Sequence, residues 1–265
     1  MTARAARPDL SGHVYTWMDM SRAEVASAVS GRLLSEGDPF LPDRMDHDEP
    51  VRQKFEPEGA TQLWQKNIST MEGLVYGQLI LERKTAPHTG FMMRWQRTPP
   101  GLWLNSLGVW ADERHFENGT DVERLLNLTV DLFNITWAGY GSVCLSSELE
   151  DKFFYVETLP SGLKSERSVG LKAQEGLADL YWANLFGPPY VKAFGRERIE
   201  SCPGAAVRRI GSDSFLLLTC DSPFDWSRPD VRRRVEEAKR HLGAEYFFDR
   251  AHPDRRPKPP DWPPE

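Results

Sequence analysis

The chain has 265 residues, of which 40% are hydrophobic and 27% are charged, a composition that is typical of a globular protein and excludes a disordered chain. This length suits one large domain or two small ones. No apolar run approaches the roughly 20 residues that span a bilayer, and no apolar segment follows the basic N-terminus. We therefore expect neither membrane insertion nor a signal peptide.

Charge is distributed unevenly along the chain, whose formal net charge is −6. Residues 1–151 hold 14 Lys and Arg against 22 Asp and Glu, whereas residues 152–265 hold 19 against 17. An acidic first half argues against nucleic-acid binding, which requires a basic face, and is compatible with a basic protein partner. The cysteines form no C-x-x-C pair, which predicts reduced core thiols in the cytoplasm; they are Cys144, Cys202 and Cys220.

The first predicted elements follow a leader, residues 1–12, that we expect to be disordered. Weak alternation predicts a strand over His13–Asp19. A capping box that starts at Ser21 predicts a helix, and Gly37 would end it. Residues 36–60 are acidic and interrupted by four prolines, so we expect a long loop without regular structure.

Three strands and a long helix are predicted next. The strands cover Leu74–Arg83, Phe91–Arg97 and Leu102–Trp110, and the short connections between them favour an antiparallel meander. A second capping box at Thr120 opens a helix with apolar residues at i, i+3, i+4 spacing, which Gly139 would end.

The second half begins with short strands in residues 142–157 and a polar linker over 158–174. The segment 176–186 predicts a helix, and Pro188 suits the first turn of another helix that ends at Gly195. A hairpin, a last helix and an edge strand follow over residues 205–220, 227–243 and 246–248, before a disordered proline-rich tail over 250–265.

This order of elements predicts an α+β fold with a mainly antiparallel sheet and helices packed on one face. We expect one domain over residues 13–249, and the linker at 158–174 is the place for a subdomain boundary.

A search for chemical motifs finds no P-loop, dinucleotide fingerprint, nucleophile elbow or zinc-ligand cluster. Asp230, Glu237 and Lys239 resemble a nuclease motif only superficially, because all three fall on one predicted helix. Glu113 and His115 lie in a charged loop. We therefore predict no catalytic residues, no metal and no cofactor.

Acidic residues are the candidates for binding a basic protein. Those of the 36–60 loop lack the closing Gly and Glu of a calcium-binding EF-hand, so a protein-binding edge is the functional alternative to a solvated loop. A second acidic group follows the predicted strands after residue 142. The predicted partner-binding residues are Asp43, Asp46, Asp48, Glu49, Glu148, Glu150 and Asp151.

The segment Leu180–Gly195, LYWANLFGPPYVKAFG, carries a resemblance to a family. It resembles a signature of bacterial polymorphic-toxin immunity proteins, particularly the immunity-protein-52-like type, and the resemblance covers residues 175–248. Such proteins are cytosolic partners that neutralise a toxin by binding it. Locally, we expect the same residues to pack and turn the chain; they are Tyr181, Trp182, Asn184, Phe186, Gly187, Pro188, Pro189, Tyr190, Phe194 and Gly195.

Three functions remain open from the sequence. The first is a non-catalytic immunity protein that occludes a toxin, with acidic steering and aromatic anchors. The second is an enzyme or small-ligand-binding protein with a pocket between sheet and helices, in which His115, Glu113 and Tyr190 would be the first candidates. The third is a structural or regulatory module of a secretion or phage-related assembly, which would self-associate.

Overall fold

The structure of the protein is a computed structural model that describes residues 9–262, except 67–68, 72–73, 87, 99–101, 104, 113–115, 117–119, 159–160 and 170–172. The fold is α+β, and every strand pairing described below is antiparallel. The chain divides between Val143 and Cys144 into two compact units, called unit 1 and unit 2, and each is described by itself.

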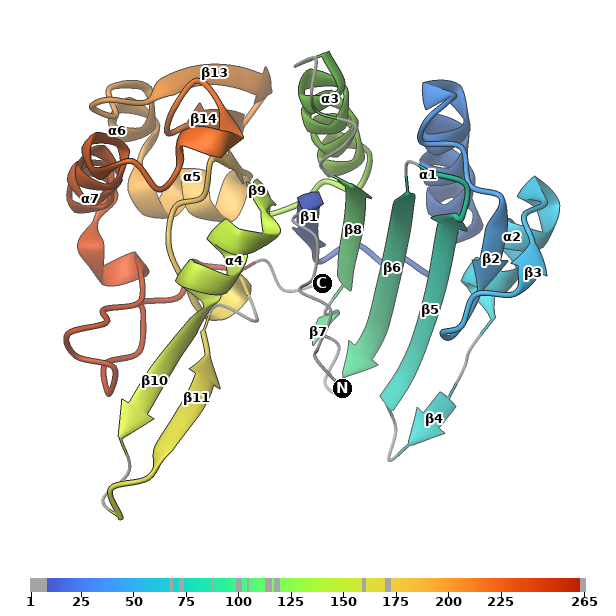
Figure 1. Ribbon diagram of the computed structural model, residues 1–265, viewed down its shortest axis with the longest axis horizontal. Coiled ribbons are helices and arrows are strands. Elements are labelled where there is room, and N and C mark those ends of the chain that lie inside the picture. Colours follow the sequence, from blue (N-terminus) through green and yellow to red (C-terminus); the bar gives the residue numbers. More distant parts are fainter. Residues whose placement is uncertain are drawn as a thin grey trace. The chain divides into compact units, whose positions relative to one another are not determined.

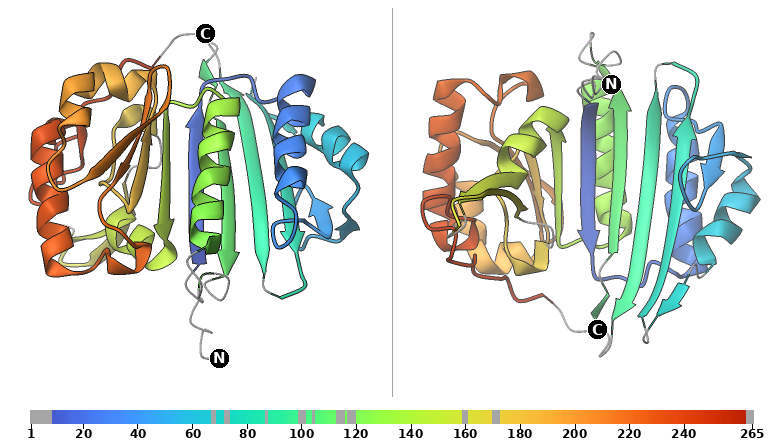
Figure 2. Two further views of the ribbon diagram at one scale, coloured as in Figure 1. Left: turned by 90° about the horizontal axis from the view of Figure 1, so that it is seen from above. Right: turned by 60° about the horizontal axis from the view of Figure 1, so that its bottom comes forward.

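Unit 1 consists of a sheet with helices on one side (Figure 1; Figure 2). Its strands lie in the order β1-β8-β6-β5-β2-β3, while β4 pairs with β5 and β7 pairs with β6. The elements are β1 Asp9–Thr16, α1 Ala23–Glu36, β2 Arg44–Asp46, β3 Gln53–Lys54, α2 Pro57–Gln65, β4 Ser69–Met71, β5 Leu74–Arg83, β6 Thr89–Thr98, β7 Leu102–Trp103, β8 Asn105–Asp112 and α3 Thr120–Ile135. Strand β9, Tyr140–Leu145, crosses the boundary, so that its last two residues belong to unit 2.

The core of unit 1 lies between the sheet and the helices α1 and α3. Strand β1 alternates buried and half-buried residues, with Leu10 and Val14 among the buried ones. Gly12 lets α3 approach this strand closely, because a Cβ atom at Gly12 would lie 2.1 Å from the Thr129 hydroxyl oxygen. The buried side chains of β1 and the apolar face of α3 therefore pack against each other in one apolar layer.

The predicted meander and the long helix are confirmed. The strands β5, β6 and β8 pair in sequence, with Leu79 opposite Met93 and Phe91 opposite Val109. Helix α3 covers Thr120–Ile135, as its apolar spacing predicts. The Thr120 side chain, on which the capping-box prediction rests, lies outside the described residues.

Three predictions for unit 1 were wrong. Strand β1 begins at Asp9, inside the predicted leader, and residues 1–8 lie outside the described part. The Ser21 hydroxyl does not cap α1 but donates to Asp19, 2.6 Å away. Residues 36–60 contain β2, β3 and the start of α2, because the prolines lie between these short elements or at a helix start, where a missing N–H costs nothing.

Unit 2 carries a three-stranded sheet segment, β13-β14-β12, and a separate two-stranded hairpin (Figure 1). Its elements are α4 Ser146–Phe153, β10 Phe154–Thr158, β11 Lys164–Ser168, the 3-10 turn η2 Ala173–Glu175, β12 Ala183–Phe186, α5 Pro188–Phe194, α6 Arg196–Glu200, β13 Ala206–Gly211, β14 Ser214–Leu218, η3 Pro223–Asp225, α7 Pro229–Leu242 and η4 Ala244–Tyr246.

The hairpin β13–β14, the helix that begins at Pro188 and the last helix α7 are confirmed. The segment expected as a helix from residue 176 instead contains strand β12, which pairs with β14. All four residues of β12 are buried, and a short continuous apolar run cannot be assigned to helix or strand by periodicity. Residues 246–248 form no edge strand: Phe247 makes an isolated bridge to Leu177.

The short strands expected within residues 142–157 are confirmed as the end of β9 and as β10. Helix α4 lies between them and was not predicted. The polar stretch 158–174, predicted as a linker, contributes the end of β10 and the whole of β11, so the two units do not divide there. The described part of the tail, residues 250–262, has no helix or strand, yet Pro260 is buried and Lys192 pairs with Asp261 at 2.7 Å.

Candidate functional site

The hairpin formed by β10 and β11, called the β10–β11 arm, extends away from the other elements of unit 2 (Figure 1). One side of the arm faces inward, where the ring of Tyr155 lies 4.9 Å from that of Phe248. The other side carries apolar residues in solvent: Val156 is 62% exposed and Phe154 is 38% exposed. Leu163, directly before β11, is 67% exposed.

These exposures are informative because a two-stranded hairpin has no core of its own in which to bury apolar side chains. Exposed apolar residues that gather in one place are typical of a protein-binding surface. Across the described residues, the other strongly exposed large apolar side chains are dispersed: Leu41, Trp137 and Phe224. The β10–β11 arm is therefore the candidate protein-binding site. Sequence analysis missed it because it expected a strand before residue 158 but a polar linker over 158–174, where β11 lies.

The predicted acidic residues of the 36–60 segment hold local structure or point into solvent. The Asp43 carboxylate accepts hydrogen bonds from the Lys84 amide and the Thr85 hydroxyl. Asp46 accepts from three groups of its own turn, among them the Gln53 amide. Asp48 and Glu49 are exposed and remain available for a basic partner.

The second acidic group requires a correction. Glu148 is 0% exposed and cannot belong to an acidic surface. Glu150 and Asp151 are exposed, but Asp151 is paired with Arg232 at 3.5 Å and its backbone oxygen accepts a hydrogen bond from Arg250. The predicted acidic residues thus divide between the two units, and of the three in unit 2 only Glu150 has an exposed carboxylate without a partner among the described residues.

Glu148 and Lys152 form a buried ion pair one turn apart on α4. The Lys152 ammonium donates to Glu148 Oε1 at 2.6 Å and to the backbone oxygen of Leu180 at 2.5 Å. The second carboxylate oxygen, Oε2, accepts from the amide of Trp182 at 3.2 Å. The rings of Tyr181 and Trp226 also lie within 6.0 Å of the ammonium, so the pair fixes α4 to the chain around Leu180.

Burial raises the pKa of Glu148, although Lys152 and the Trp182 amide oppose the rise. A perturbed buried carboxylate is a common sign of a catalytic site. Here, however, both carboxylate oxygens already have partners within the protein. A buried ion pair that supports the fold needs such partners, so we assign Glu148 a structural role. Sequence analysis missed the pair because it expected no helix between the short strands of residues 142–157, although the E-x-x-x-K spacing is typical of a helical pair.

The residues of the 180–195 motif pack the core of unit 2, as expected. Asn184 accepts from the Tyr181 amide at 3.0 Å and donates to the Tyr181 oxygen at 2.9 Å, which closes the turn before β12. The Trp182 indole donates to the backbone of Cys220 at 3.0 Å. The remaining members are Phe186 and Phe194, whose rings meet edge to face, and the helix-terminal residues Gly187, Pro188, Pro189, Tyr190 and Gly195.

Of the three residues suspected of ligand binding, the structure describes only Tyr190. Tyr190 is fully buried and donates its hydroxyl to Ala173 at 2.5 Å, and burial raises the pKa of its phenol. Glu113 and His115 lie outside the described residues. Asp230, Glu237 and Lys239 all lie on α7, where Asp230 pairs with Arg228 and Lys239 pairs with Asp179.

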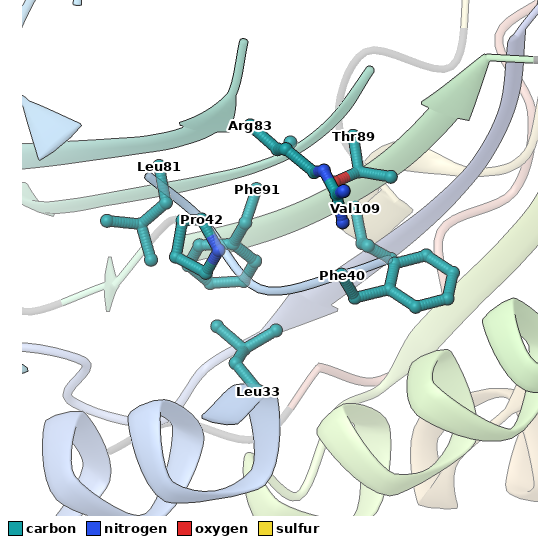
Figure 3. Close-up of a pocket in the computed structure, with 9 residues that line it drawn as sticks. Leu33, Phe40, Pro42, Leu81, Arg83, Thr89, Phe91 and Val109 are labelled. Atoms are coloured by element: carbon teal, nitrogen blue, oxygen red, sulfur yellow. The ribbon is translucent and has the colours of Figure 1, made fainter. Parts of the chain in front are cut away.

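A small hollow lies between α1 and the sheet of unit 1, where a ligand pocket was an alternative (Figure 3). Its volume is about 10 Å³, too small for a ligand. Leu33, Phe40 and Leu81 make its lining mainly apolar, while Arg83 at its rim pairs with Asp38. This hollow is a packing gap in the core.

Among the described residues, no helix is long and apolar enough to cross a membrane. In the same part of the chain, no three His, Cys, Asp or Glu side chains gather where they could hold a metal ion.

Comparisons with known proteins support the fold and little beyond it. No protein-family model matches the sequence, and no curated protein matches it significantly. The solved structure of the Pseudomonas aeruginosa T6SS protein PA0821 is similar to this chain, with a TM-score of 0.53 and 13% identity over 90% of this chain and 74% of that one. At this identity the likeness shows a shared fold. The comparisons do not identify the immunity-protein-52-like family.

Proposed function

We propose that this protein is a non-catalytic binding protein, and specifically a cytoplasmic immunity protein that neutralises a cognate toxin by direct binding. The observation that carries the proposal is the β10–β11 arm, where Val156 and Leu163 are 62% and 67% exposed. Apolar side chains on an arm without a core contribute little to folding. Burial of one such side chain against a partner would contribute about 1.5–3 kcal/mol.

The distribution of charged groups also supports binding over catalysis. The most deeply buried carboxylate, that of Glu148, is engaged by Lys152 and Trp182. The exposed carboxylates of Asp48, Glu49 and Glu150 would favour a basic toxin and speed its association. The secretion context follows from two likenesses, that of the 180–195 motif to immunity proteins and that of the fold to a T6SS protein.

The test is coexpression with the product of the adjacent gene, followed by copurification and a growth assay. The variant V156K/L163K removes the apolar contacts of the arm, and Lys at position 156 would face Glu166 across the hairpin, which preserves the strand pairing. We expect this variant to lose copurification and protection of the cells. F224K changes another exposed apolar residue of unit 2 and is the matched control.

Failure of the wild-type protein to bind or protect would remove the immunity proposal. Binding that survives V156K/L163K but not F224K would place the interface elsewhere. Self-association in solution without a toxin partner would favour a structural module instead.

A further inference from the structure

An open pocket of about 890 Å³ lies in unit 2, at the base of the β10–β11 arm. Three parts of the chain enclose it: the strands of the arm, the turn η2 with Gly176, and the tail after Phe248. Its volume is at the upper end of the range of known ligand pockets, roughly 300–1,000 Å³. The lining residues used below are Tyr155, Gln174, Glu175, Phe248, Arg255 and Arg256.

The tail forms one wall of this pocket through specific contacts. Gly176 has a φ of +117°, and a Cβ atom there would lie 2.3 Å from Cβ of Pro257, so a glycine is required for the tail to lie this close. The amide of Lys258 donates to the backbone oxygen of Glu245 at 2.6 Å. The Lys258 ammonium lies 5.1 Å from the centre of the Tyr246 ring. The wall is therefore built by packing, although it contains no helix or strand.

The pocket offers both an apolar and a cationic surface. Tyr155 and Phe248 supply aromatic rings, and Gln174 supplies an amide. Arg255 and Arg256 are exposed, and within the described residues neither guanidinium has a hydrogen bond or an ion pair. Glu175 is the acidic residue of the lining, and it has an interaction partner within the protein.

These two guanidinium groups are set apart by their position, because Arg198 and Arg233 are also exposed without a described partner but do not line the pocket. Arg196, Arg228 and Arg232 all pair with aspartates. A guanidinium group binds a carboxylate through two parallel hydrogen bonds, and it does so most strongly beside surface that excludes water. Two free groups on the wall of a half-apolar pocket thus favour a ligand with carboxylates and apolar side chains.

We propose that this pocket binds an acidic, extended segment of a polypeptide. Arg255 and Arg256 would bind its carboxylates, while Tyr155 and Phe248 would contact its apolar side chains. The size and open side of the pocket suit a chain that passes through it better than a small enclosed molecule. This site goes beyond the proposed function and does not depend on the partner being a toxin.

The test is fluorescence anisotropy with a fluorescein-labelled peptide of alternating Glu and Leu. We expect saturable binding that weakens with added salt, because exposed charges are screened. The same peptide with Gln in place of Glu should bind at least tenfold more weakly. R255Q/R256Q should lose at least tenfold in affinity for the Glu peptide.

Two controls separate the pocket from general charge effects. R198Q/R233Q removes two other exposed arginines of unit 2 whose side chains have no described partner, and it should bind the peptide as the wild type does. G176A should weaken binding without changing charge, because its methyl group displaces Pro257 from the wall. Near-ultraviolet circular dichroism checks that each variant is folded.

Four results would overturn the proposal. They are no binding of the Glu peptide, equal binding of the Gln peptide, an equal loss in R198Q/R233Q, or tighter binding of a single-stranded oligonucleotide. The immunity proposal is tested separately by copurification with the adjacent gene product, so either proposal can fail alone.

Discussion

The buried pair Glu148–Lys152 and the pocket arginines Arg255 and Arg256 use charge in opposite ways. In the pair, the carboxylate and the ammonium have partners within 3.2 Å that come from the protein itself. In the pocket, the guanidinium groups have no partner within the described residues. A charge that is satisfied internally holds the fold, whereas an unsatisfied charge beside a cavity is available for another molecule.

The contrast between the internally paired charges and the free arginines predicts its largest loss of stability for a substitution in the buried pair. E148Q removes the negative charge and leaves the Lys152 ammonium buried without an ionic partner. We expect a loss of about 3–5 kcal/mol in the free energy of unfolding. Urea unfolding followed by tryptophan fluorescence measures it, with the exposed E150Q as the control. A loss below about 1 kcal/mol would mean that the pair contributes little to the fold.

The second prediction concerns Lys152, the other member of this pair, and the pH dependence of the free energy of unfolding of K152M. Burial already raises the pKa of Glu148, and K152M removes the ammonium that opposes this rise. The folded state then keeps a proton on Glu148 to a higher pH than the unfolded state, so stability is full below the unfolded pKa of about 4.3 and falls as pH rises through the folded pKa.

K152M should therefore lose more stability relative to wild type at pH 8 than at pH 5, by about 1.4 kcal/mol for each unit by which the Glu148 pKa of the variant exceeds that of the wild type within this range. Urea unfolding at both pH values measures the difference. Equal losses at pH 5 and pH 8 would show that Glu148 does not change protonation over this range.

The packing of the tail is the next target. G176A introduces strain at a positive φ and a clash with Pro257, and we expect it to cost about 1–3 kcal/mol. It should also speed tryptic cleavage after Arg255. G162A is the matched control, since Gly162 has a φ of +81° but no atom within 4 Å of its Cβ position. Equally fast cleavage in both variants would mean that the tail is not packed on Gly176.

The sequence predicts well those elements whose pattern is local. Strands β5, β6 and β8 alternate and are joined by short turns, and α3 has a complete helical stripe, so each is specified by its own residues. Strand β12 is buried on both faces and loses its alternation, which made it look like part of a helix. Helix α4 is short and partly polar, so its periodicity is weak.

The sites were predicted less completely, since they depend on contacts between distant segments. The aromatic and glycine-proline pattern of the Tyr181–Gly195 motif predicts a packing role, and its aromatic side chains are buried in the structure. Glu148 was assigned to an acidic surface because its partner lies on a helix that was not predicted. The tail pocket depends on the contact of Gly176 with Pro257, which no local pattern in the sequence indicates.

The smallest expected effect concerns the cysteines. Cys144, Cys202 and Cys220 are buried, and burial raises the pKa of the Cys202 thiol to about 11. Few thiolates are present at pH 8, so Ellman's reagent should react slowly with the native protein and rapidly after denaturation. Rapid reaction of the native protein would show that unit 2 opens readily.

The central claim is that the Glu148–Lys152 pair holds the fold whereas Arg255 and Arg256 are free to bind a ligand. The most direct test is the free energy of unfolding of R255Q/R256Q, measured by urea denaturation alongside that of E148Q. If these arginines serve a ligand and not the fold, the double variant should stay within about 0.5 kcal/mol of wild type, as surface changes away from structural contacts do. A loss of more than about 1.5 kcal/mol, beyond that range, would contradict the account, because it would show that Arg255 and Arg256 hold the tail in place.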